Sequence, residues 1–158
     1  MLALFPIGRS AADPAPPVVA APDERHKLAM VFLDKLQADS LMKQLIQGSR
    51  ANVIVIFHRI GKTEQQAGEI FDQFMLPEFL ARIPELRQQF EDILATDFTE
   101  TELRSVLENQ QNEARQTAIA KAPQMQAEFT KAGQDWGRQV GQDAYTKNKA
   151  ALQKLGMD

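Results

Sequence analysis

The C-terminal part of the sequence most constrains the fold, because it has the residue spacing of one long amphipathic helix. From Pro123 to Leu155, apolar residues recur every three or four positions and would share one broad face, with charged and amide side chains opposite. Proline is favoured in the first turn of a helix, and Gly156 is typical of a helix end. The segment therefore predicts a continuous helix from Pro123 to Leu155, the longest in the protein.

Three glycines follow one edge of this apolar face at a spacing of four residues. Each costs about 1 kcal/mol relative to alanine in an exposed helix. The spacing is typical of a close contact between two helices, because backbones without Cβ atoms can approach more nearly. We expect a contact with another helix of the same chain or with a second copy of the protein, and a flexible or kinked helix is the third alternative. The candidate contact residues are Gly133, Trp136, Gly137, Val140, Gly141 and Ala144.

The sequence from Asp23 onward also has helical periodicity. The β-branched run "NVIVIF", from Asn52 to Phe57, resembles a strand, but no second run could pair with it, so we predict a buried helix. Thr63 begins a helix with a capping box, and Pro77 and Pro84 each fit the first turn of one. The sequence predicts an all-α, single-domain bundle of five to seven helices over residues 23–158, with the longest helix at the C-terminus.

Residues 1–22 have a different composition. The stretch 10–22 is rich in proline and alanine and lacks helical periodicity, which is typical of a mobile tail or linker. The first ten residues, "MLALFPIGRS", are compatible both with the end of a secretory signal and with an ordinary tail. No run reaches the roughly 18 apolar residues of a membrane span.

The composition argues against several classes of function. A net charge of −3 without a dense basic run argues against nucleic-acid binding. The absence of cysteine excludes disulfides, thiol nucleophiles and cysteine metal sites, and His26 and His58 lack metal-ligand spacing. There is no nucleophile elbow or phosphate-binding loop. Residues 61–110 are acidic, but the spacing of their carboxylates singles out no catalytic pair. We expect no catalytic site, no cofactor and no metal site.

The stretch "DFTETELRSVLE" is compatible with two interpretations. It has the length of a calcium-binding loop and an acidic residue at each end, but Glu102 stands where such a loop needs glycine. Thr99 and Glu102 instead have the spacing of a capping box, which predicts the start of a helix.

This stretch also carries a resemblance to a known family. "DFTETELRSVL", followed by Pro123 in "AKAPQMQAE" and by a long helix containing "WGRQV", resembles the bacterial helical domain catalogued as domain of unknown function 2059. The resemblance extends from about Phe98 to Val140. The slots between its two ends, at Asn109, Gln110, Asn112, Arg115 and Thr117, depart from the usual residues of that family. The resemblance implies an all-α fold and a periplasmic, exported protein, and it implies no activity.

Two functions follow as expectations. The first is a non-enzymatic periplasmic interaction or structural module that self-associates through helices or binds a protein partner. The alternative is a carrier that holds a small apolar ligand or lipid between its helices, because helical bundles accommodate such ligands. The candidate pocket residues are Phe71, Phe74, Phe90 and Trp136.

Overall fold

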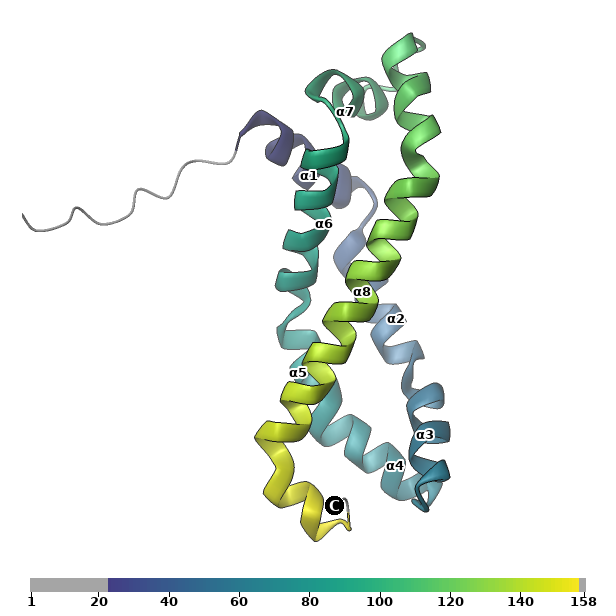
Figure 1. Ribbon diagram of the computed structural model, residues 1–158, viewed down its shortest axis with the longest axis vertical. Coiled ribbons are helices and arrows are strands. Elements are labelled where there is room, and N and C mark those ends of the chain that lie inside the picture. The colour runs from purple at the N-terminus through teal and green to yellow at the C-terminus, as the bar shows by residue number, and fades with distance from the viewer. Residues whose placement is uncertain (1–22, 157–158) are drawn as a thin grey trace, which may run out of the picture.

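The computed structural model describes residues 23–156 and shows a single all-α domain (Figure 1). The expected N-terminal tail, residues 1–22, lies outside the described residues. Within them there is no strand, and the fold class is as predicted. The helices are α1 (Glu24–Lys35), α2 (Ala38–Gly48), α3 (Arg50–Arg59), α4 (Glu64–Ile70), a π-helical turn η1 (Phe71–Met75), α5 (Leu76–Ala81), α6 (Ile83–Asp97), α7 (Glu100–Leu107) and α8 (Glu113–Lys154). Since α4, η1 and α5 run on without a break, the number of separate helices falls within the predicted range.

Helix α8 runs the length of the molecule, and the other helices are arranged along it (Figure 1). The prediction that this helix begins at Pro123 is wrong, because it begins at Glu113. The side chain of Asn112 accepts a hydrogen bond from the backbone N–H of Arg115 at 2.9 Å and so caps the helix. Pro123 lies inside the helix, where it removes only one backbone hydrogen bond from a long ladder.

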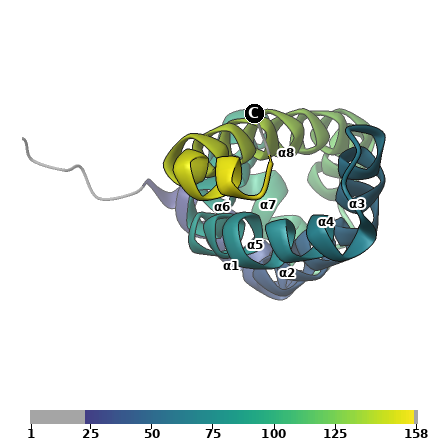
Figure 2. The same cartoon turned by 90° about the horizontal axis from the view of Figure 1, so that it is seen from below.

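The main core lies where α1 packs against α6 and α7, and where α6 and α7 pack against α8. Leu33 of α1, Leu94 of α6, Leu103 of α7 and Val140 of α8 are almost completely buried. The view along the molecule shows α8 on one side and α1, α2 and α5 on the other (Figure 2). The apolar face predicted for the C-terminal helix therefore supplies one wall of the core.

Local signals in the sequence placed several helix ends correctly. Thr63 and Thr99 begin α4 and α7 with complete capping boxes, in which the side chains of Gln66 and Glu102 accept from the backbone N–H groups of the threonines. Pro84 lies in the first turn of α6, whereas Pro77 lies in α5, which continues η1 without a break. Both features work through contacts within a few residues, which is why the sequence reveals them.

The segment "NVIVIF" is helical, as predicted, but the prediction that it is buried is wrong. It belongs to α3, in which no residue is buried. Val55 and Ile56 are 52% and 58% exposed. The reason is position: α3 packs on α2, α4 and η1 at the side of the bundle, so it has a neighbour on one side only.

Candidate functional site

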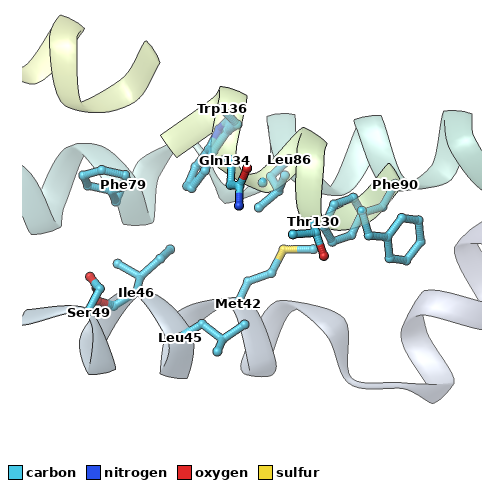
Figure 3. A pocket seen from close by; sticks show the side chains of 12 residues that line it. Met42, Leu45, Ile46, Ser49, Phe79, Leu86, Phe90, Thr130, Gln134 and Trp136 are labelled. Atoms are coloured by element: carbon cyan, nitrogen blue, oxygen red, sulfur yellow. Dashed lines mark hydrogen bonds between the residues drawn. The ribbon is translucent and has the colours of Figure 1, made fainter. Parts of the chain in front are cut away.

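An apolar groove with a volume of about 500 Å³ lies between α2 and α8. Both helices pack on α5, and both pack on α6, but they make no comparable contact with each other among the described residues. Figure 3 shows Met42 and Ile46 pointing from α2 toward α8 across this space. The groove is lined by Met42, Leu45, Ile46, Ser49, Phe79, Leu86, Phe90, Phe129, Thr130, Gly133, Gln134 and Trp136.

Two aromatic pairs form rigid parts of the wall. The rings of Phe90 and Phe129 stack at a centroid distance of 4.1 Å with planes 5° apart. Phe79 meets Trp136 edge to face at 5.5 Å and 72°. These pairs fix α5 and α6 against α8, because aromatic packing is favourable in both geometries. The groove therefore has a wall that is already formed without a ligand.

Two of the polar side chains along the groove are satisfied within the protein. The Ser49 hydroxyl donates to the carbonyl of Ile46 at 2.6 Å, and the Thr130 hydroxyl donates to the carbonyl of Gln126 at 2.8 Å. None of the lining residues is charged. The surface that the groove offers is therefore almost entirely apolar, and it suits a hydrocarbon chain or an apolar ring system better than a charged group.

Gly133 keeps the groove open on the α8 side. A Cβ atom built on this glycine meets no atom within 4 Å. Since Gly133 lines the groove, a larger side chain at this position would extend into the space between α2 and α8. The glycine costs helix stability but leaves room for a ligand.

The expectation of a close intramolecular helix contact along the glycine edge is wrong for Gly133 and Gly137. A Cβ atom on Gly137 also meets nothing within 4 Å, and one on Gly141 would lie at an ordinary contact distance, 3.9 Å, from the Phe79 ring. The helical spacing located the apolar face correctly, but spacing alone does not show which part of that face is covered by another helix. Within residues 23–156, no other helix approaches Gly133 or Gly137 closely enough to require a glycine there.

The remaining candidate contact residues belong to the interior of the bundle. Trp136, Val140 and Ala144 are buried, at 5% exposure or less. Trp136 and Val140 join the main core, and Ala144 lines a second, smaller cavity described below. Their burial is explained by packing within this chain.

The four candidate pocket residues do not meet in one pocket. Phe90 and Trp136 line the groove, whereas Phe71 is buried at 1% exposure. Phe74 lines a separate cavity of about 190 Å³ near the C-terminal end of α8. The helical spacing of Phe71 and Phe74 indicated an inward face but not which neighbouring helix each would meet.

Sequence reasoning missed the α2 side of the groove. Met42 and Ile46 are one turn apart on α2, and Leu45 lies beside Ile46 in the sequence. The spacing identifies an apolar face, and it carries no information on whether another helix covers that face. The opening therefore becomes visible only in three dimensions.

Trp136 combines burial with an unused donor. Its indole ring lines the groove, and its Nε1 is buried with no hydrogen-bond partner within residues 23–156. A buried donor without a partner costs about 1–3 kcal/mol.

The motif that carries the family resemblance forms a structural junction. Lys121 of α8 donates to Oε2 of Glu102 at 2.7 Å and to the carbonyl of Asp97 at 2.8 Å. Burial raises the pKa of Glu102, but the hydrogen bonds from Lys121 and Thr99 outweigh it, so the pKa is lowered overall. The contacts are all within the protein and fasten the α6–α7 turn to α8.

Comparison of the chain with protein-family models, with curated proteins and with solved structures finds no match. The resemblance to domain of unknown function 2059 stays a prediction. Among residues 23–156 no group of three or more histidine and acidic side chains is arranged to hold a metal ion. None of the helices in that range combines the length and apolar character needed to cross a bilayer. The groove is therefore the feature on which a function is argued.

Proposed function

We propose that the protein binds an apolar ligand, such as a molecule with a long hydrocarbon chain, in the groove between α2 and α8. The observation that carries the proposal is an open groove of about 500 Å³ without a charged lining residue. That volume falls within the range of roughly 300–1,000 Å³ that is typical of ligand pockets. This is the carrier function that the sequence left as its alternative.

Three features of the groove suit such a ligand. The stacked pair Phe90–Phe129 gives a preformed wall, so little side-chain ordering is needed on binding. Gly133 leaves space one turn further along α8 from Phe129. Gln134, an exposed amide, is a polar lining group able to meet an oxygen of the ligand. A charged head group would remain at the open side, in water.

We infer a non-enzymatic role, because the groove presents mostly hydrocarbon and no charged acid or base, and its two hydroxyls, of Ser49 and Thr130, donate to backbone carbonyls. The periplasmic location stays an expectation based on the family resemblance. Self-association through α8 also stays a prediction. Its remaining support is the open space at Gly137, which a second copy could occupy.

Native mass spectrometry of the full chain, purified under non-denaturing conditions from its own cells, tests the proposal. We expect an additional mass from a bound apolar molecule, which organic extraction removes and added oleate restores. The variant Gly133→Leu, which fills the groove, should purify without the additional mass.

The control is Gly137→Leu, which adds the same side chain one helical turn further along, outside the groove. This variant should retain the adduct. A wild-type protein that carries no adduct and takes up no oleate would contradict the proposal.

A further inference from the structure

A second surface, formed by α2 and α3, exposes apolar side chains. Half of the ten large apolar residues that are exposed within residues 23–156 lie in the short range 41–60. They are Leu41, Leu45, Val55, Ile56 and Ile60, with exposures of 50% to 74%. A concentration of exposed apolar residues is typical of a surface that contacts a protein, a membrane or a ligand.

Apart from Asp39 in the first turn of α2, which accepts a hydrogen bond from Arg87, the charged residues of α2 and α3 are basic. Between residues 40 and 63 the chain has Lys43, Arg50, Arg59 and Lys62 and no aspartate or glutamate, although the whole protein has a net charge of −3. Arg50 is held by Asp72 through two hydrogen bonds of 2.9 Å. The other three cations form no ion pair within residues 23–156.

The free cations differ in what they contact. Lys62 donates to the carbonyls of Leu155 and Gly156 at the end of α8, which fixes its position without neutralising its charge. Lys43 and Arg59 are exposed. Besides Asp72, which binds Arg50, the carboxylate of Glu64 lies beside α3, in the hollow shared with His58. The surface therefore joins exposed apolar groups to positive charge.

We infer that the α2–α3 surface docks onto a bilayer that contains anionic lipids. Helical segments that combine apolar groups with lysine and arginine lie in the membrane interface, where the cations attract anionic head groups and the apolar groups enter the acyl boundary. A second copy fits less well, because a symmetric contact would place this positive surface against itself.

The position of the surface connects it to the groove. Leu45 is 74% exposed, belongs to the α2–α3 surface and lines the groove, and Ser49 at the end of α2 lines the groove as well. A bilayer in contact with α2 would therefore lie next to the groove opening, within reach of a hydrocarbon chain. This connection rests on the proposed function, whereas the docking itself does not.

Co-sedimentation with lipid vesicles tests the docking. We expect the full chain to bind vesicles made of equal parts phosphatidylcholine and phosphatidylglycerol, to bind phosphatidylcholine alone much more weakly, and to dissociate as salt is added. The double variant Lys43→Ala/Arg59→Ala should lower the partition coefficient about 10- to 30-fold. Ile56→Asp should lower it as well, because it removes an inserting apolar group.

Matched variants control for the loss of charge and of apolar surface elsewhere. Lys131→Ala/Arg138→Ala removes two exposed cations from α8, and Val31→Asp changes an exposed apolar residue of α1. Both should bind anionic vesicles like the wild type, and circular dichroism should show all variants folded.

Three results would overturn the inference. The first is equal binding to the two kinds of vesicle, and the second is wild-type binding by Lys43→Ala/Arg59→Ala. The third is a wild-type dimer that Ile56→Asp converts into a monomer, because the surface would then be a self-association interface. Oleate uptake by Lys43→Ala/Arg59→Ala separates the two proposals, since the variant should lose vesicle binding while its groove still fills.

Discussion

At the scale of single residues, Asp97 is an unfavourable charged group in the junction between α6 and α8. Its Oδ2 atom is buried without a hydrogen-bond partner within the described part of the chain. Burial and the neighbouring carboxylate of Glu128 raise the pKa of Asp97, and the charge of Lys121 opposes this shift only in part. At neutral pH the ionised side chain therefore lowers the stability of the fold.

We expect Asp97→Asn to stabilise the protein by about 1 kcal/mol at neutral pH, which corresponds to a rise of about 2–4 °C in Tm. Because the folded-state pKa is raised, the wild type gains stability relative to this variant as the pH falls toward 3.8, the ordinary value. Thermal unfolding of both proteins across this pH range measures the difference, which should shrink on acidification.

Glu128→Gln serves as the matched test, because it removes the other member of the pair. It should also raise Tm at neutral pH, and the two substitutions together should give less than the sum of their separate effects. A lower Tm for Asp97→Asn at neutral pH would show that the charge of Asp97 is favourable in its place.

At the scale of the helices, the two capping boxes differ in their surroundings. Glu102 of α7 is buried and bonded to Lys121, whereas Gln66 of α4 is exposed. Thr99→Ala should therefore destabilise the protein by about 1 kcal/mol or more, and Thr63→Ala should cost less. Chemical denaturation of the two variants provides the comparison. A larger loss for Thr63→Ala would indicate that the junction at α7 contributes little.

Gly137 tests the helix α8 itself. A Cβ atom at this position meets no atom of the chain within 4 Å, so Gly137→Ala should stabilise the helix by about 1 kcal/mol. Thermal unfolding and light scattering should show a higher Tm and an unchanged molecular size. A lower Tm, or a loss of oligomers, would mean that a second copy packs on the glycine edge.

The sequence predicted the helices themselves better than how each helix packs against its neighbours. Local signals act within their own helices, so the sequence alone predicts the effects of Thr63, Thr99 and Pro84. The start of α8 was missed because Pro123 is a favoured opening residue, and the cap at Asn112 was the weaker signal. The exposure of α3 was missed because an apolar helix is usually buried, and only the arrangement of the bundle leaves it at the side.

At the scale of the whole molecule, the groove is a consequence of how α2 and α8 pack on shared neighbours. Helices α2 and α8 rest on the same neighbours, α5 and α6, and leave a space between them. Of its lining, the sequence predicted Phe90 and Trp136 as pocket residues and Gly133 as a contact residue. The space itself could not be predicted, because it depends on the distance between helices that are far apart in the chain.

The central claim is that this groove binds an apolar molecule, and the fluorescence of Trp136, the single tryptophan of the chain, tests it most directly. Oleate titrated into delipidated protein should change the Trp136 emission with the same Kd in the wild type and in Gly137→Leu. Gly133→Leu should raise that Kd at least about tenfold, a loss of about 1.4 kcal/mol, without lowering Tm. Equal Kd values in all three proteins, or no change of emission in the wild type, would contradict the claim.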